Sequence, residues 1–427
     1  MTAPRSPGTR AALRSPGLLL LIPVGIILAA AALTPPREFS TNQGDVGLYL
    51  DDARAIVDGR TPYSAVPLEY PPLALVPMVA PYLLGLPFGE VTPDRYRWLF
   101  AGWEAALALA LGFVLVQIAR RGGIPTRSRD PAWAVALRYP ILVAGAALAI
   151  TWRFDAFAAL LLAIALWATL ANRPTPAGIA LGLGALAKLF PIAVAWLAPR
   201  DNRRLARFGL ATVLTVVIGM LPFLAMAGPD ALAFLGYQAR RGLEVESIGA
   251  GVVLLDGLVR GQPIETASPF KAVEVFGPLA RTWLGLLPAM TLAAFGALAV
   301  AAWRRVRFDV EAIGRVEPRT LTSLAGATVM VLLLTSKVFS IQYVVWLVPF
   351  AALLPGWRFW LAAAMVALTM PIHPILFAGL VAQEPLPVLV LNLRNALLVA
   401  LTTWVLVDLV RPLSQMTARH PPISTSL

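Results

Sequence analysis

The stretch FSTNQGDVGLYLDDARAIVDGRTPYSAVPLEYPPL, residues 39–73, is the polar exception in an otherwise apolar chain, and this contrast decides the fold. It carries several acids and ends in a Tyr-Pro-Pro group. Around it, apolar runs of about 17–25 residues recur, and each is long enough to cross a bilayer as a helix. We therefore expect a membrane domain whose chemistry lies in this loop, with Asp45 as the first candidate residue.

The composition indicates a polytopic α-helical membrane protein. Of the 427 residues, 58% are hydrophobic and 14% are charged, whereas soluble domains carry about 25% charged residues. A β-barrel is disfavoured because barrel strands alternate and are about ten residues long, while these apolar runs are continuous. The net charge of +12 is explained by Lys and Arg in cytoplasmic loops, which argues against nucleic-acid binding.

Cysteine and histidine usage excludes several kinds of site. The chain has no cysteine, so disulfides, thiolate catalysis and Cys-ligated metals are excluded. Its two histidines, His373 and His420, lie far apart in the sequence, which disfavours a His-rich metal site. We expect neither a metal nor a cofactor.

The first part of the chain is predicted to place a long loop outside the cell. Residues 1–16 form a cytoplasmic tail whose arginines orient an uncleaved first span at 18–33. The first external loop, 34–97, is expected to contain interfacial helices. One of them is predicted at 45–57, where apolar residues recur at helical spacing: Val46, Leu50, Ala53 and Val57.

Charge decides the interpretation of the next apolar segment, residues 73–88. If this segment spanned the membrane fully, the arginine-rich loop at 119–129 would lie outside the cell, against the charge rule. We therefore interpret it as re-entrant or interfacial, and a full span stays the alternative.

The remaining segments predict roughly ten or eleven crossings within one domain, residues 17–411. A cytoplasmic tail follows at 412–427, and residues 228–280 form a second external segment. The stretch AGIALGLGALAKLFPIAVAWL, residues 177–197, has basic loops on both sides, so a single crossing breaks the charge rule. Because Pro191 offers a break, we predict two half-length helices, in and back, with Lys188 near the tip.

This topology collects polar side chains on the external side, where ionisable residues near a membrane are functional candidates. Cations there would hold a phosphate, and one carboxylate would act as a base. Asp45 is the predicted base, although a carboxylate at the start of a helix can also serve only to stabilise that helix. The predicted substrate-binding residues are Tyr49, Tyr63, Tyr70, Arg153, Asp155, Lys188, Arg240, Arg241, Glu244, Lys337, Gln342 and Tyr343.

Several of these candidates also have a purely structural interpretation. Arg153 and Asp155 can form a pair at a helix turn, and Lys188 can snorkel towards the membrane surface. Arg240 and Arg241 can flank an interfacial helix and touch lipid headgroups. The tyrosines of the first external loop can wall a pocket without taking part in chemistry.

Four motifs together resemble the integral-membrane glycosyltransferases of the GT-C superfamily, in particular the actinobacterial polyprenol-phosphate-mannose-dependent α-(1,2)-mannosyltransferase-like family. In chain order they are GDVGLYLDDARAIVDGRTPYSAVPLEYPPL, GLGALAKLFPI, RRGLEVES and TSKVFSIQYVVWLVPF. The resemblance covers essentially the whole membrane region and implies an all-α GT-C-like bundle with external catalytic loops. It also implies a polyprenyl-phosphate sugar donor, no nucleotide sugar and no essential metal.

The resemblance also implies roles for individual residues. The family's acidic residue early in the first external loop falls on Asp45, which would be the general base on the acceptor hydroxyl, with inversion at the anomeric carbon. Where some members carry a His pair in a late external loop, this chain has Gln342 and Tyr343. The donor phosphate would be neutralised by basic residues from three segments, namely Lys188, Arg240, Arg241 and Lys337.

The resulting hypothesis is a plasma-membrane hexosyltransferase that transfers mannose from a polyprenyl-phosphate donor to a cell-envelope glycolipid or lipoglycan on the outer face. A polyprenyl-phosphate-pentose (arabinosyl) transferase keeps the fold and changes the donor. A transporter or flippase of lipid-linked sugars is a rival, and it predicts internal symmetry and polar residues in both membrane halves. A non-catalytic scaffold would tolerate replacement of Asp45.

Overall fold

The computed structural model describes residues 16–34, 44–123, 130–270 and 272–411, and most of them are helical. The first half contains η1 (Leu18–Leu21), α2 (Ile22–Leu33), α3 (Asp45–Val57), η3 (Pro72–Ala74), α4 (Leu75–Gly85), η4 (Leu86–Phe88), α5 (Pro93–Arg120), α6 (Pro131–Gly145), α7 (Ala147–Trp152), α8 (Asp155–Leu170), α9 (Pro174–Ala187) and η5 (Phe190–Leu197), where η marks a 3-10 helix. The predicted tails, except residue 16 of the first, and residues 39–43 of the polar loop lie outside the described residues.

The second half begins with a long helix and continues into a polar segment. Its helices are α10 (Asn202–Ala227), η6 (Gly228–Leu232), α11 (Ala233–Arg240), α12 (Ile248–Arg260), α13 (Pro278–Ile313), α14 (Pro318–Leu334), η7 (Ile341–Tyr343), α15 (Val344–Ala351), α16 (Trp357–Ile372), α17 (Phe377–Val381) and α18 (Pro385–Val410).

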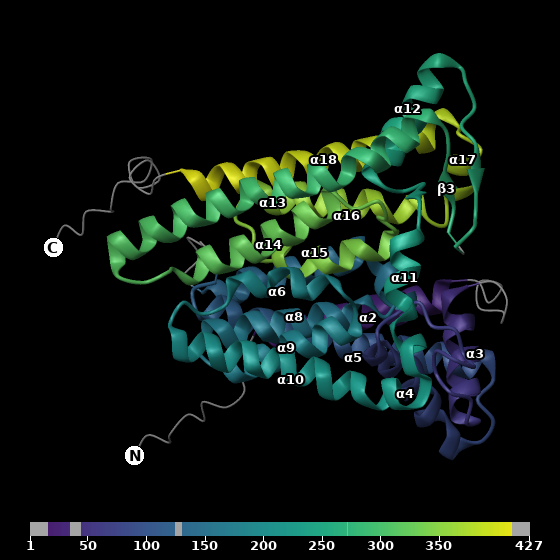
Figure 1. The fold of residues 1–427 in the computed structure, drawn as a ribbon, viewed down its shortest axis with the longest axis horizontal. Coiled ribbons are helices and arrows are strands. Elements are labelled where there is room, and N and C mark those ends of the chain that lie inside the picture. The colour runs from purple at the N-terminus through teal and green to yellow at the C-terminus, as the bar shows by residue number, and fades with distance from the viewer. Residues whose placement is uncertain (1–15, 35–43, 124–129, 271, 412–427) are drawn as a thin grey trace, which may run out of the picture.

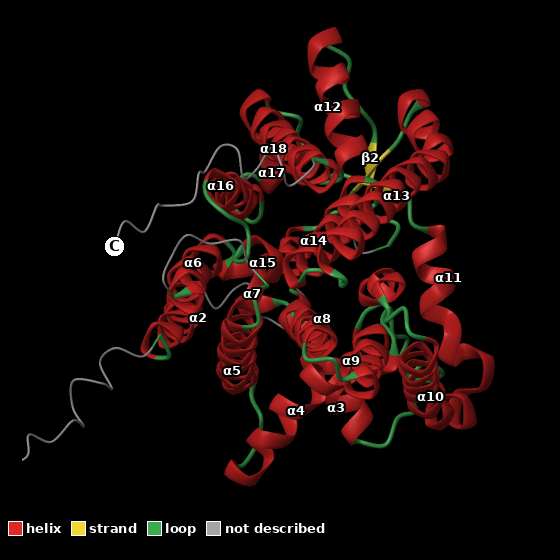
Figure 2. Cartoon of the chain, turned by 90° about the vertical axis from the view of Figure 1, so that its left-hand side faces the viewer, coloured by secondary structure: helices red, strands yellow, loops and turns green. Residues whose placement is uncertain are grey.

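The long helices lie side by side along the longest axis of the molecule. The C-terminal ends of α13 and α18 lie at the left end in Figure 1, whereas α3, α11, α12 and α17 gather at the right end. Seen from the left end (Figure 2), α8, α14 and α15 lie in the interior and α5, α10, α13 and α18 lie around them. The burial agrees, since most side chains of α8, α14 and α15 are buried.

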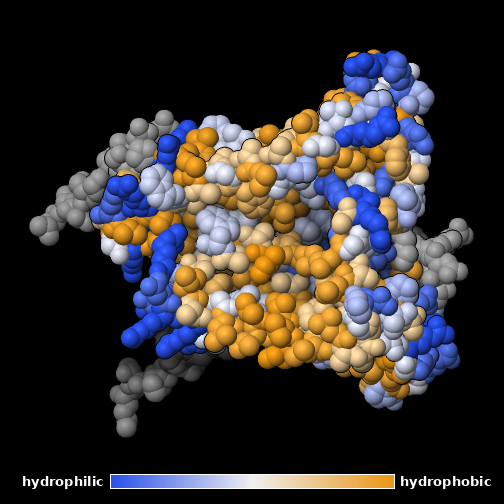
Figure 3. All heavy atoms as spheres, viewed as in Figure 1, coloured by the Kyte–Doolittle hydropathy of each residue, from blue (hydrophilic) through white to orange (hydrophobic). Residues whose placement is uncertain are grey.

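An apolar belt surrounds the bundle. Figure 3 shows orange side chains along the middle of one face and blue ones at both ends. Large apolar side chains point outward on the outer helices, among them Leu210 and Ile218 on α10 and Leu292 on α13. A soluble protein rarely exposes so large an apolar surface, so this belt is suited to lipid.

Four helical stretches within the described residues are long and apolar enough to cross a membrane: Pro93–Arg120, Asn202–Arg240, Pro278–Ile313 and Pro385–Val410. Seven shorter apolar helices accompany them, including Pro72–Phe88. The architecture is therefore that of an α-helical membrane protein. The expected ten or eleven crossings, and the re-entrant placement of residues 73–88, stay predictions.

One small sheet departs from the all-α prediction. Three two-residue strands, β1 (Leu243–Glu244), β2 (Thr266–Ala267) and β3 (Glu274–Val275), pair antiparallel with β3 in the middle. They lie in residues 228–280, the predicted second external segment, whose loops on either side of α12 lack a continuous helical pattern. The sheet fixes the backbone of Glu244, because this residue pairs with Glu274.

Helix α3 has the predicted bounds and mostly the predicted buried face. Val46, Leu50 and Ala53 are buried, whereas Val57 is exposed because it lies at the last turn of the helix. Gly44 is the N-cap residue and makes no side-chain cap hydrogen bond. Asp45 occupies the first turn, and its carboxylate pairs with another element, as described below.

The break near Lys188 is also present. Helix α9 ends at Ala187, and the chain resumes as a 3-10 helix at Phe190, rather than as the second α-helix that we expected. Close packing fixes α9 against α10: a Cβ atom on Gly178 would lie 2.2 Å from the carbonyl oxygen of Phe208. A glycine at the contact between two membrane helices lets their backbones approach closely.

Candidate active site

A pocket of about 360 Å³ opens at the end of the bundle where α3 and α11 lie. Segments far apart in the sequence form its walls: α3, the Pro67–Tyr70 loop, the turn after α7, the chain from α11 to β1, and the residues around η7 and α17. Its acidic lining residues are Asp45, Asp52, Glu69, Glu244 and Glu246, and its basic ones are Arg153 and Arg241. The predicted mixture of carboxylates and cations is thus present in one pocket.

Asp45 and Arg153 meet in the wall of this pocket. The Nε atom of Arg153 lies 2.6 Å from Oδ2 of Asp45, and 33% of the Asp45 side chain is exposed. Arg153 also donates from Nη1 to the carbonyl oxygen of Trp152, at 3.0 Å, which fixes its guanidinium near the backbone. Asp45 is therefore held in place and still reachable from the pocket, as a general base must be.

Glu244 is held by hydrogen bonds from the loop that follows α14. The amide of Phe339 donates to Oε2 of Glu244 at 2.7 Å, and the Ser340 hydroxyl donates to Oε1. The amide of Glu244 itself donates to the carbonyl oxygen of Lys337, at 2.9 Å. A carboxylate so fully engaged is suited to shaping the pocket and to orienting its neighbour Arg241, whose Nη2 lies 3.7 Å from Oε1.

Arg241 presents donors that the protein leaves unused. Only 9% of its side chain is exposed, and its buried Nε and Nη2 atoms have no hydrogen-bond partner among the described residues. A buried donor without a partner is costly. An anionic group in the pocket would supply the missing acceptors, since arginine binds phosphate through paired N–H groups.

Glu246 lines the same pocket and is almost fully buried. Burial, together with the charge of Glu244, raises the pKa of Glu246 to about 8, against the opposing charges of Arg394 and Arg153. Its Oε1 atom has no hydrogen-bond partner among the described residues. At neutral pH this carboxyl group is mainly protonated, so it can donate a hydrogen bond into the pocket.

Lys188 and Asp155 form a separate buried pair outside the pocket lining. Lys188 Nζ lies 2.6 Å from Asp155 Oδ1, which also accepts a hydrogen bond from Trp346 Nε1 at 2.5 Å. The rings of four aromatic residues surround the ammonium group at 5.1–5.5 Å: Tyr70, Phe154, Tyr343 and Trp346. The alternative pairing of Arg153 with Asp155 is wrong, because Arg153 pairs with Asp45.

Four further candidates do not reach the pocket lining. Arg240 is exposed at the end of α11, and Lys337 donates from Nζ to the carbonyl oxygen of Ala239 at 2.8 Å. Tyr63 donates to the carbonyl oxygen of Tyr70, at 2.8 Å, and so positions that residue. Tyr343 stacks on Trp346 behind the pocket. The candidates that do line the pocket are Asp45, Tyr49, Tyr70, Arg153, Arg241, Glu244 and Gln342.

The predicted substrate-binding residues leave out several polar residues of the pocket lining, among them Glu246, Tyr237 and His373. Glu246 and Tyr237 belong to the polar segment that contains Arg241, so their position in that segment was an available signal. His373 is the C-cap residue of α16, in a Pro-Ile-His-Pro stretch that ends this helix. Burial and the nearby charge of Arg153 lower the pKa of His373 to about 4, so its ring is neutral at pH 7.

Metal binding finds no support in the described part of the chain. No group of three or more His, Cys, Asp or Glu side chains there is arranged to hold a metal ion.

Comparisons with known proteins leave the family open. No protein-family model matches the chain, and no curated protein matches its sequence. Among solved structures, the oligosaccharyltransferase of Archaeoglobus fulgidus in its apo form matches with a TM-score of 0.43 and 14% identity. The match covers 95% of this chain and 58% of that one, and similarity at this level establishes neither a common fold nor a common activity.

Proposed function

We propose that the chain is a membrane glycosyltransferase that takes a sugar from a polyprenyl-phosphate donor. The observation that carries this proposal is the pocket itself, in which the reachable carboxylate of Asp45 lies among arginine side chains. Such a pocket suits a substrate that has both a phosphate and a hydroxyl group to be activated. The four sequence motifs that resemble GT-C glycosyltransferases favour the same reaction.

Asp45 is the proposed general base. Its pairing with Arg153 holds the carboxylate in one position. The acceptor hydroxyl would give its proton to this carboxylate as its oxygen attacks the anomeric carbon of the donor sugar. The new bond joins the acceptor oxygen to that carbon, and the bond from the carbon to the phosphate oxygen breaks. Polyprenyl phosphate leaves, and the configuration at the anomeric carbon of the transferred sugar is inverted.

Arg241 is the proposed binding residue for the donor phosphate. Its buried guanidinium has unused donors, and negative charge grows on the phosphate as the leaving group departs. Fixed donors directed at growing charge stabilise a transition state effectively. Glu246 and His373 are uncharged at neutral pH and line the same space, so they can hydrogen-bond sugar hydroxyls without repelling the phosphate.

Lys188, Arg240 and Lys337 are not part of this mechanism, because none of them lines the pocket. Lys188 instead neutralises Asp155 behind Tyr70. The proposed phosphate site is therefore smaller than the sequence suggested, with Arg241 as its main cation and Arg153 beside it.

Mannose as the sugar, a glycolipid or lipoglycan as the acceptor, and the outer face of the plasma membrane as the location are parts of the proposal that rest on the motif resemblance. Membranes containing the wild-type chain should transfer label from radiolabelled polyprenyl phosphate mannose to an envelope lipid extract. Transfer from a pentosyl donor alone would correct the sugar. Absence of transfer from either donor, with the protein folded, would contradict the proposed function.

A further inference from the structure

A second pocket, of about 220 Å³, lies at the end of the bundle remote from the first. It lies between the C-terminal parts of α13 and α18 and the starts of α14 and α16 (left end in Figure 1). Its basic lining residues come from four different segments: Arg305, Arg319, Arg358 and Arg411.

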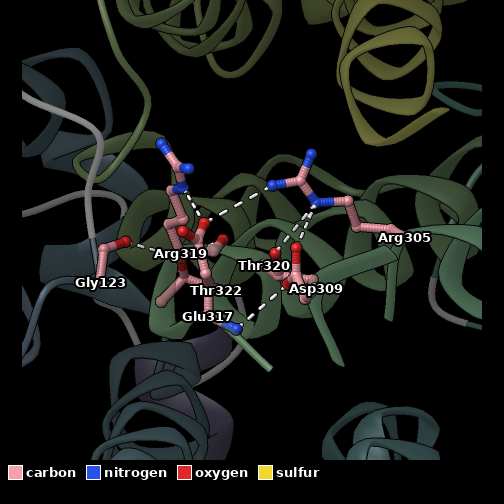
Figure 4. Close-up of polar contacts among 7 residues, drawn as sticks. All are labelled: Gly123, Arg305, Asp309, Glu317, Arg319, Thr320 and Thr322. Atoms are coloured by element: carbon pink, nitrogen blue, oxygen red, sulfur yellow. Dashed lines mark hydrogen bonds and ion pairs between the residues drawn. The ribbon is translucent and has the colours of Figure 1, made fainter. Parts of the chain in front are cut away.

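Two acids, the buried Asp309 and the partly exposed Glu317, hold Arg305 and Arg319 from one side. Arg305 Nε lies 3.1 Å from Oδ1 of the buried Asp309, and Arg305 Nη2 lies 3.5 Å from Oε2 of Glu317. Glu317 also pairs with Arg319 Nε. Figure 4 shows that the outer nitrogens of Arg319 and the remaining outer nitrogen of Arg305, Nη1, point to the same side, away from these acids. The acids therefore orient the arginines and leave their outer N–H groups for a ligand.

Arg358 faces the pocket from α16. Its Nη2 atom lies 2.5 Å from Oδ2 of Asp408, while its buried Nε has no hydrogen-bond partner among the described residues. Arg411 Nη1 is 3.9 Å from the same carboxylate. The four arginines face three acids, Asp309, Glu317 and Asp408. One positive charge is thus in excess, and several N–H donors remain for an anion with multiple oxygens.

Tryptophans place this pocket at the edge of the apolar belt. Trp357 and Trp404 are exposed, and their ring centroids lie 5.4 Å apart. The guanidinium of Arg358 lies 5.0 Å from the Trp357 ring, and that of Arg411 lies 5.7 Å from the Trp404 ring. Tryptophan rings concentrate at the level of lipid headgroups. The lining also includes Val405 and Leu409, which offer an apolar wall for the part of a lipid next to its headgroup.

We propose that this pocket binds the phosphate of an anionic phospholipid. The arginines supply several oriented N–H donors, and their excess positive charge favours a headgroup with net negative charge. Because the pocket lies beside exposed tryptophans, we expect the phosphate to belong to a membrane lipid. Basic pockets between membrane helices are recognised binding sites for such headgroups. The site is independent of the proposed transfer reaction, because none of its residues lines the first pocket.

Native mass spectrometry of the full chain in an uncharged detergent tests this proposal. Phosphatidylglycerol should bind the wild type and Arg304→Gln, because Arg304 is exposed and outside the pocket. Arg319→Gln and Arg358→Gln should each weaken binding about tenfold or more, since a hydrogen bond to a charged group is worth about 1.5–3 kcal/mol. Phosphatidylcholine should bind less tightly, because its choline would meet the excess positive charge.

Thermal unfolding gives a second measurement on the same proteins. Phosphatidylglycerol should raise the unfolding midpoint of the wild type and of Arg304→Gln more than that of the two pocket variants. Equal binding by all four proteins would overturn the site. If inorganic phosphate alone raises the unfolding midpoint of the wild type as much as phosphatidylglycerol does, the proposal that the bound phosphate belongs to a lipid is wrong. Circular dichroism of the unliganded variants checks their folding, and Arg319, on the partly exposed edge of the site, is the safer substitution.

Discussion

The Nε atom of Arg153 lies 2.6 Å from Oδ2 of Asp45, which joins the turn after α7 to the first turn of α3. A second contact supports this junction, because Trp152 Nε1 lies 3.3 Å from the hydroxyl oxygen of Thr34, the first residue of the predicted first external loop. Two segments that are distant in the sequence thus meet at one carboxylate. The proposed base has a fixed position because two distant parts of the chain position it, and its activity should depend on both.

Arg241 should matter more for donor binding than its neighbour Arg240. Arg241→Gln should raise the KM for the donor about tenfold or more, because a charge-assisted hydrogen bond is worth about 1.5–3 kcal/mol. Arg240→Gln is the matched control, since Arg240 is exposed and lies outside the pocket lining. Steady-state transfer kinetics measure the difference, and equal effects of the two substitutions would argue against a phosphate at Arg241.

Glu246 should make the stability of the protein depend on pH. Burial raises its pKa from 4.5 to about 8, so the folded state favours the protonated group and the unfolded chain releases the proton more readily. Its contribution to stability is complete below about pH 4.5 and is lost as the pH rises through about 8. Stability should therefore fall over this window.

Glu246→Gln keeps the shape of a protonated carboxyl group and removes its titration. The variant should unfold at nearly the wild-type temperature at pH 5 and at a higher temperature at pH 9, by the equivalent of a few kcal/mol. Glu265→Gln is the control, because Glu265 is exposed. A gap between wild type and Glu246→Gln that stays constant with pH would contradict a protonated Glu246.

Lys188 should act as a structural residue. Lys188→Met removes the partner of the buried Asp155, and an unpaired buried charge of this kind costs about 3–5 kcal/mol. The double variant Lys188→Met, Asp155→Leu should recover part of the lost thermal stability, because it leaves no unpaired charge. If Lys188→Met instead remains as stable as the wild type and loses donor binding, Lys188 belongs to the phosphate site.

The close contact between α9 and α10 should be sensitive to a single methyl group. Gly178→Ala would place its Cβ 2.2 Å from the carbonyl oxygen of Phe208, and overpacking of this kind costs about 1–3 kcal/mol. Gly209→Ala on α10 is the control, because a Cβ there meets no atom within 4 Å. Thermal unfolding should show a lower midpoint for Gly178→Ala only, and equal midpoints would contradict the contact.

Local patterns in the sequence predict much of this fold. The bounds of α3 follow from helical spacing of apolar residues between Gly44 and Asp58-Gly59. The break near Lys188 follows from Pro191 and from basic loops on both sides of one apolar segment. The three strands escape such reasoning because each has two residues, which is too short for an alternating pattern to appear.

The sequence predicts which residues line the candidate site better than it predicts the ion pairs that these residues form. Asp45, Arg153 and Arg241 are expected in one pocket, and they line one. The external position of this pocket stays a prediction. The partners of Asp45 and Asp155 are set by packing between distant helices, which no local pattern records. The sequence alone suggests Lys188 as a phosphate-binding residue, because it does not show the partner of this lysine. In the structure that partner is Asp155.

The measurement that tests the proposed function most directly is sugar transfer by Asp45→Asn, which keeps the size of the side chain and removes the base. The control is Asp51→Asn, on the same helix and outside the pocket lining. With polyprenyl phosphate mannose and an envelope lipid extract, Asp45→Asn should lose at least about 10²-fold in transfer rate, while the control keeps the wild-type rate. Transfer by Asp45→Asn at the wild-type rate would contradict the role of Asp45 as the base.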